Sequence, residues 1–295
     1  MAWFNEFPAL DSESLRTLKQ GIDESFRDFT RAHGESIERA FEPLQQALIG
    51  TERLLTGTPW PLLVCLLAAF AWWGSRSWRI TVGSVLTLLL IGWFGMWDDT
   101  LKTVSMITVS TALALLIGVP LGIAMSRSNR LQSLLTPLLD VMQTLPSFVY
   151  LIPVVMLLGI GRVPGLLAVV VYAIAPVIRL TNLGLRLVDH DVLEAADAFG
   201  ATPWQRLKGV QLPLALPTLM AGVNQTIMMA LAMVVVASMI GVQGLGQPVL
   251  KAISNQYFAL GLFNGLAIVG IAIVFDRVSQ AWGFRLQRHR KAGHD

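Results

Sequence analysis

Long apolar runs with almost no charged residues dominate this chain, and they limit what it can fold into. A helix needs about 20 apolar residues to cross the core of a bilayer, and inside that core only helices and closed barrels satisfy the backbone. Because these runs are long and do not alternate with polar residues, they predict helices. The expected spans are 59–74, 80–97, 101–125, 137–160, 164–180, 217–242 and 261–284.

Composition supports the same class. Hydrophobic residues make up 54% of the chain and charged residues 14%, with a mean hydropathy of +0.60. Soluble domains usually carry about a quarter of charged residues. We therefore predict an all-α membrane protein with about seven transmembrane helices and an N-terminal helical tail outside the membrane. Cys65 is the single cysteine and the four histidines are scattered, so neither a disulfide nor a metal site is expected.

The lysines and arginines predict the orientation. If the seven spans alternate, one side collects thirteen basic residues and the other three, namely Lys102, Arg162 and Lys251. Loops rich in Lys and Arg face the cytoplasm. The expected organisation is an external tail over 1–58, a transmembrane domain over 59–285 and a basic cytoplasmic tail over 286–295. The thirteen are Arg76, Arg79, Arg127, Arg130, Arg179, Arg186, Arg206, Lys208, Arg277, Arg285, Arg288, Arg290 and Lys291.

The tail over 1–58 differs from the rest of the chain. It holds ten acidic and six basic residues, and its net negative charge suits translocation. Apolar residues such as Leu15, Leu18 and Ile22 recur at helical spacing, which indicates an amphipathic helix. We expect one or two such helices on or near a surface. A solvated, partly disordered tail is the alternative.

A polar stretch, EAADAFGATPWQRLKGVQLP over 194–213, lies in the largest expected cytoplasmic loop, 181–216. Asp191 followed by Glu194 predicts a capped helix start, and Gly200 predicts a turn with positive φ. Pro203 fits the first turn of a second helix, which Pro213 is expected to end. The loop thus predicts a helix–turn–helix on the cytoplasmic face. An ordinary amphipathic connector is the alternative interpretation.

The spacing of this stretch resembles the signature loop of ABC importer permeases. In that family the loop forms a coupling helix that seats on an ATP-binding subunit. The chain has no GxxxxGK[ST] phosphate loop, so nucleotide chemistry is expected on another chain. The matching positions are Glu194, Ala195, Ala196, Gly200, Val210, Leu212 and Pro213.

Three further segments, 138–165, 175–186 and 217–247, resemble the glycine betaine/proline betaine permeases of osmoprotectant uptake systems. The resemblance implies a homodimeric permease without enzymatic activity of its own in the inner membrane of a bacterium, surrounded by lipid. It implies two ATP-binding subunits, an external substrate-binding protein and a quaternary ammonium cargo. This chain is expected to bind no cofactor, with ATP and Mg on the partner subunit, and no nucleic acid.

Polar residues within the spans are candidates for a translocation path, because polar side chains at membrane depth face protein or water. The alternative is that they only hydrogen-bond neighbouring helices. Tryptophans at the ends of the first two spans are typical of an interfacial belt rather than a ligand cage. The candidate path residues are Gln143, Thr144, Pro146, Tyr150, Asn224 and Gln225.

Three other functions stay open at this stage. The first is an ABC permease for another small solute, such as an amino acid or a sulfonate. The second is an ion-coupled secondary carrier or channel, although the later spans hold no deep carboxylate, which such carriers often need. The third is a membrane scaffold without transport.

Overall fold

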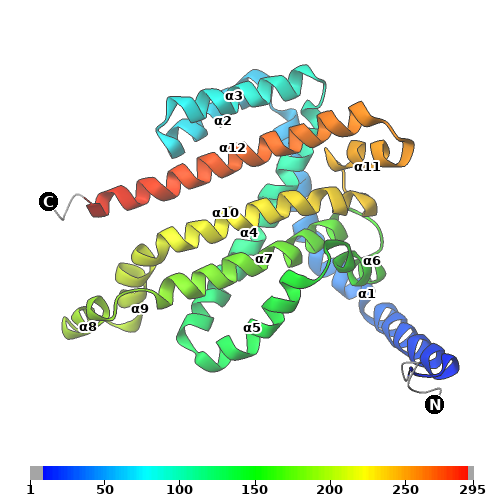
Figure 1. The fold of residues 1–295 in the computed structure, drawn as a ribbon, viewed down its shortest axis with the longest axis horizontal. Helices are drawn as coiled ribbons and strands as arrows, with labels where there is room; N and C mark the ends of the chain where they lie inside the picture. Colours follow the sequence, from blue (N-terminus) through cyan, green and yellow to red (C-terminus); the bar gives the residue numbers. More distant parts are fainter. Residues whose placement is uncertain (1–8, 292–295) are drawn as a thin grey trace, which may run out of the picture.

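A computed structural model of the 295-residue chain describes residues 9–291, and this part is helical with no strand. The chain has long helices joined by short turns, with a polar helical loop at one end (Figure 1). The elements are α1 (Ser12–Gly57), α2 (Trp60–Ser75), α3 (Trp78–Trp93), α4 (Trp97–Arg127), α5 (Asn129–Thr144), η2 (Ser147–Tyr150), α6 (Leu151–Leu158), α7 (Arg162–Arg186), α8 (His190–Ala198), α9 (Pro203–Arg206), η3 (Leu207–Gln211), α10 (Leu212–Ala237), η4 (Ser238–Ile240), α11 (Gly246–Asn255) and α12 (Phe258–Lys291).

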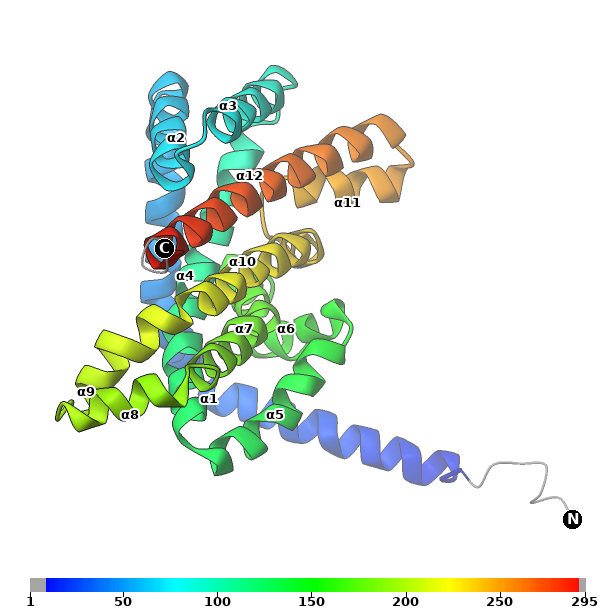
Figure 2. The same cartoon turned by 60° about the vertical axis from the view of Figure 1, so that its left-hand side comes forward.

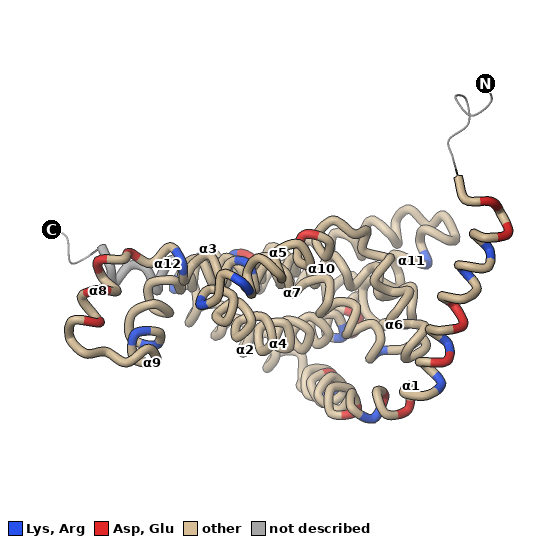
Figure 3. Tube along the Cα trace, turned by 90° about the horizontal axis from the view of Figure 1, so that it is seen from below, with Lys and Arg blue, Asp and Glu red and all other residues tan. Residues whose placement is uncertain are grey.

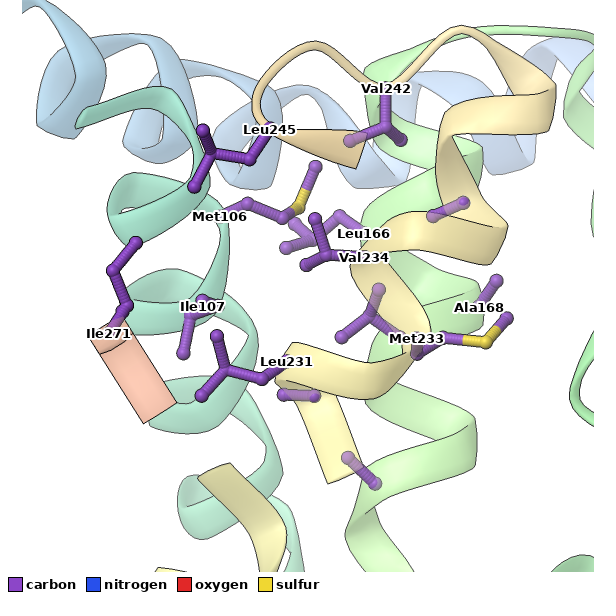
Figure 4. Close-up of a cluster of buried hydrophobic side chains, with 14 of the residues drawn as sticks. Met106, Ile107, Leu166, Ala168, Leu231, Met233, Val234, Val242, Leu245 and Ile271 are labelled. Atoms are coloured by element: carbon purple, nitrogen blue, oxygen red, sulfur yellow. The ribbon is translucent and has the colours of Figure 1, made fainter. Parts of the chain in front are cut away.

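Helix α7 is the centre of the fold, with α4 and α10 packed along it more extensively than any other pair of helices. Helix α12 lies beside α10, and α2 and α3 cover the outer edge (Figures 1 and 2). Figure 4 shows apolar side chains from α4, α7, α10, α12 and the segment after η4 meeting in one buried cluster. Members of this cluster include Ile107, Leu166, Met233, Val242, Leu245 and Ile271.

Glycines allow α4 to approach α7 closely. A Cβ added to Gly122 would lie 2.6 Å from the Thr181 Cβ and 2.7 Å from the Ile178 carbonyl oxygen, and one added to Gly118 would lie 2.5 Å from the Val177 Cγ1. Small residues four apart permit such contacts between membrane helices. At the C-terminal end of α7, Arg186 donates to the Met125 carbonyl, which ties α7 to the end of α4.

The segment expected as one span over 137–160 is broken. Helix α5 ends at Thr144, and the helix that follows from Ser147 is bent away by 112°. Leu145 is extended, with φ −63° and ψ 134°, because the ring of Pro146 disfavours the helical conformation of the preceding residue. The same effect at Thr58 and Pro59 separates α1 from α2, with a bend of 110°.

Within residues 9–291, four helices are long and apolar enough to cross a membrane as single rods: α4, α7, α12 and the continuous run Pro203–Ile240. Two bent pairs, α1 with α2 and α5 with η2–α6, bring the number to six at most. Helix α3 is apolar but has 16 residues, about 24 Å at 1.5 Å per residue. The seven expected apolar segments are therefore present, but three of them are short or bent and do not form single spanning rods.

The other boundaries shift modestly. The expected span 80–97 ends at Trp93 instead, where a turn containing Gly95 with φ +77° begins. Helix α11 was not expected from the sequence. The basic tail is helical as far as Lys291, and residues 292–295 lie outside the described part.

Helix α1 is one helix of 46 residues rather than two. It begins at Asp11, whose carboxylate accepts from the Ser14 N–H, and the hydrogen bonds from Ser14 hold the pKa of Asp11 below its ordinary value. Its first part projects from the body and carries charges of both signs (Figures 2 and 3). Its last part packs on α4, α6 and α7, where Leu48 is 2% exposed.

We predict that Gly122→Ala destabilises the fold, because the added methyl group would force α4 away from α7. Overpacking of this kind typically costs about 1–3 kcal/mol. Gly265→Ala is the matched control, since nothing lies within 4 Å of the added Cβ on α12. Thermal unfolding of the purified protein in detergent measures both. Equal unfolding temperatures would contradict the close packing of α4 on α7.

Candidate functional site

The polar loop between α7 and α10 begins with α8, a helix of nine residues. Its N-cap is Asp189, whose side chain accepts from the backbone N–H of Asp191 at 3.0 Å. The prediction that Asp191 caps the helix was therefore wrong by two residues. Asp191 lies in the first turn, where its charge complements the positive end of the helix dipole.

Gly200 ends this helix in the left-handed region, with φ +78°, as its position in the sequence predicted. The second helix, α9, follows at once. Thr202 and Gln205 form a capping box at its start, in which the Thr202 hydroxyl accepts from the Gln205 N–H. Pro203 occupies the first turn, where its missing N–H costs nothing.

Pro213 does not end the second helix, so that prediction was wrong. Residues 203–240 form one continuous helical run. The stretch Leu207–Gln211 just before Pro213 is a π-helix. Pro213 has no N–H to donate to the residue four positions earlier, and its ring crowds that carbonyl, so the helix widens locally instead of stopping.

Helix α8 has no buried residue, although it is well formed. With α9 it projects from one end of the molecule, where charged residues gather (Figure 3). Phe199, at its C-terminal end, is 93% exposed. This end of the chain therefore combines charged residues with an exposed aromatic side chain.

Three contacts make the loop rigid. Arg206 on α9 donates to the Asp197 carboxylate on α8. Leu207, 2% exposed, packs with Leu185 at the end of α7 and with Ala215 on α10. The ammonium group of Lys208 lies 4.6 Å from the centre of the exposed Trp204 ring. Trp204 thus contacts a residue of its own helical run.

The predicted coupling residues lie along this loop. Glu194 is exposed and its carboxylate lies 3.1 Å from the His190 ring nitrogen. Ala195 is exposed and Ala196 half-buried on α8. Leu212 packs against the cluster around Leu207, and Pro213 is exposed beside it.

The predicted path residues fall into two groups. Gln143 and Thr144 are exposed at the end of α5, and Pro146 is exposed in the bend that follows. Tyr150 is only 8% exposed, and its hydroxyl donates to the Met142 carbonyl. This tyrosine braces the bend from inside, with its ring against Tyr172.

The second group lies on α10 and lines a cleft of about 480 Å³ between α10 and α12. The Asn224 amide nitrogen donates to the Asp276 carboxylate at 2.8 Å, and its oxygen accepts from Ser279 at 2.7 Å. Gln225, one residue on, is exposed. The side chain of Gln280 also donates to Asp276, at 2.6 Å. The Asp276 carboxylate thus orders two of the side chains that line the cleft, Asn224 and Gln280.

Sequence reasoning missed several of these residues. Phe199 is an aromatic residue beside a helix-ending glycine in a polar loop, and that position is the signal that identifies it. The ties Arg206–Asp197 and Asn224–Asp276 span 9 and 52 residues. The first pair could have been predicted, because a helix–turn–helix brings residues nine positions apart close together. The second depends on how α10 and α12 pack.

Similarity to known proteins bears on the whole chain. The chain is 46% identical to the Escherichia coli glycine betaine/proline betaine transport system permease protein ProW over 82% of this chain and 68% of that protein. It is 49% identical to the Listeria monocytogenes glycine betaine/carnitine transport permease protein GbuB, over 76% of this chain and 80% of that one. An inward-facing structure of the MetNI methionine ABC transporter has a similar fold, with a TM-score of 0.58 and 21% identity over 63% of this chain and 94% of the other.

Residues 114–288 match the family described as binding-protein-dependent transport system inner membrane component. This range includes α7, the polar loop, α10 and most of α12. The resemblance noted in the sequence is confirmed by this match and by the extent of identity to the relatives. The chain belongs to the family of binding-protein-dependent transport system inner membrane components.

Proposed function

We propose that this chain is the permease subunit of an ABC importer that moves glycine betaine, proline betaine or related quaternary ammonium solutes into the cell. In this proposal two copies of the chain form the pathway, two ATP-binding subunits power it and an external binding protein delivers the cargo. The observation that carries the proposal is the unburied helix α8, fixed rigidly to the end of a 38-residue helical run.

The mechanical part of the proposal follows from the helical run 203–240, which is here called the rod. A displacement of α8 reaches α9 through the Arg206–Asp197 ion pair, and α9 continues into α10 without a break. Because α10 also carries Asn224 and Gln225, a movement of the ATP-binding subunit at one end shifts polar side chains in the membrane. Energetic coupling of this kind needs packed and hydrogen-bonded elements, which this route supplies.

The cargo is inferred from the relatives and from the cleft. Two relatives, at 46% and 49% identity, are permeases for glycine betaine with proline betaine or with carnitine. The cleft places the amide groups of Asn224 and Gln225 beside the side chains of Met220 and Met228. Amide dipoles solvate a charged head group, and methionine adapts to irregular apolar shapes. Neither group encloses the ligand, which suits passage rather than retention.

The tryptophans support a different role from ligand binding. Trp72 contacts Trp78, and Trp73 contacts Trp282, with ring centres 6.4 and 6.1 Å apart. Trp72, Trp73 and Trp78, like Trp93, are exposed at the ends of α2 and α3. Amphipathic rings in such places belong at membrane interfaces. Selection of the quaternary ammonium group is then the task of the binding protein.

Reconstituted transport tests the proposal directly. Proteoliposomes would hold this chain with its ATP-binding subunit and binding protein, and uptake of labelled glycine betaine would be measured with and without ATP. Unlabelled choline, carnitine and proline rank the cargo by competition. ATP-dependent uptake is the expected result. ATP-binding subunits that associate without any uptake would overturn the cargo, and failure to recover such subunits would overturn the importer.

We predict that Gly200→Ala impairs ATP-driven uptake. No atom lies within 4 Å of the added Cβ, so the change acts only through the left-handed backbone at φ +78°. A non-glycine residue there costs roughly 1–2 kcal/mol, which shifts a conformational population about 5–30-fold. Gly209→Ala is the matched control in the same loop, with equally open surroundings and no positive φ. Equal uptake by both variants would contradict a role for the turn.

We also predict that Phe199→Ala weakens binding of the ATP-binding subunit by about 2 kcal/mol, or roughly thirtyfold in Kd, as for a central aromatic anchor. Phe258→Ala is the control, because this aromatic residue is 81% exposed but begins α12, away from the loop. Titration of the purified subunit onto detergent-solubilised permease gives both values. Unchanged binding of the Phe199 variant would remove it from the interface.

The orientation is part of the proposal: α8 inside the cell and the start of α1 outside. The single cysteine makes a labelling test simple. In a Cys65→Ser background, Ser14→Cys should react with a membrane-impermeant maleimide added to intact spheroplasts. Ala198→Cys should react only after the membrane is opened. Both positions are exposed on the protein, so the reverse pattern would overturn the orientation.

A further inference from the structure

Arg162, the first residue of α7, is held by acceptors from two distant parts of the chain. Its Nη1 donates to the Glu52 Oε2 at 2.7 Å, and its Nη2 donates to the Gln243 Oε1 at 2.9 Å. These partners lie 110 and 81 residues away in the sequence. One guanidinium therefore joins α7, α1 and the segment 241–245 between η4 and α11.

The anchor on α1 is firm. The side chain of Glu52 is 18% exposed and that of Arg162 is 33% exposed, so solvent and salt screen this pair less than a surface pair. One turn earlier, Leu48 is inserted into the main core cluster and fixes the backbone of α1 against the core. Removing the arginine would leave a largely buried carboxylate without the partner that it has here.

Segment 241–245 is anchored by two buried side chains, while the side chain between them stays exposed. Val242 and Leu245 are fully buried, and the Leu245 N–H donates to the Thr103 Oγ1 on α4 at 2.9 Å. Gln243 between them is exposed, and its amide oxygen accepts from Arg162. This segment directly follows the helical run 203–240, whose other end carries the proposed coupling loop.

We propose that Arg162 is a positioning residue that fastens segment 241–245 to α1, and so holds the outer end of the 203–240 rod in register with α7. This inference rests on the proposed function. The two hydrogen bonds from Arg162 to Glu52 and Gln243 are here called the fork. A displacement that begins at α8 moves segment 241–245 only when the fork opens, that is, when these bonds break. The fork thereby sets how strictly ATP hydrolysis depends on arrival of the loaded binding protein.

The fork geometry explains why the residue is arginine. A guanidinium presents two terminal nitrogens in one plane and reaches two acceptors at once. A lysine is a single point of charge and can keep the Glu52 contact while losing the bond to Gln243. Arg162→Lys is therefore expected to retain part of the effect, and Arg162→Gln to lose it.

Hydrogen–deuterium exchange of the isolated permease tests the fastening without any transport. In Arg162→Gln, the amides of 241–247 should exchange faster by about threefold to tenfold, which corresponds to the net contribution of one solvent-exposed hydrogen bond. Arg39→Gln is the charge-matched control, because its ion pair with Glu35 on α1 is fully solvated. Unchanged exchange at 241–247 in the Arg162 variant would overturn the proposal.

The coupling role is tested by ATP hydrolysis in the reconstituted complex. Arg162→Gln and the milder Gln243→Ala should raise hydrolysis without binding protein several-fold and lower the uptake per ATP, with Arg162→Lys intermediate. Faster exchange without any change in this ratio would overturn the positioning role. A wild-type complex without ATP-dependent uptake defeats the proposed function instead, while the exchange measurement still decides whether the fork holds the segment.

Discussion

The close contact of three backbones along α7 is the constraint on which the rest of the molecule depends. On one side, Gly118 and Gly122 let α4 press against α7. On the other, an added Cβ at Gly222 of α10 would lie 3.2 Å from the Val177 Cα, and Gly184 of α7 faces α10 in the same way. In a membrane no hydrophobic effect drives helices together, so close packing of small residues supplies much of the association.

This close packing holds α10 along α7 and lets it connect two distant parts of the molecule. Because the helical run 203–240 is continuous and α10 packs along α7, a displacement at one end is transmitted towards the other. The N-terminal end of the run is preceded by a short helix that buries nothing of its own. Its C-terminal end leads into the segment held by Arg162 and Thr103. The polar network around Asn224 lies between them.

The sequence predicted much of this arrangement, and its errors have physical causes. The local chemistry of Gly200 and Pro203 was read correctly because turns and first-turn prolines depend on a few neighbouring residues. Pro213 was wrongly predicted to end the helix. The helix widens into a π-helix just before this proline and continues, and Leu207 in the widened turn packs against the apolar residues around it. The break at Pro146 could have been predicted from the sequence, since the residue before a proline avoids the helical region.

By itself, the sequence determined the helical class, the apolar segments, the polar loop and its turn, and the resemblance to importer permeases. The first three follow from composition, hydropathy or spacing within about twenty residues, and the resemblance rests on motifs that are continuous in the sequence. Only the tertiary structure decided that α1 docks on the core, that Asp276 orients Asn224 and that Arg162 joins Glu52 to Gln243. Such pairs are separated by 52 to 110 residues. Their meeting depends on how the helices pack, which no local pattern specifies.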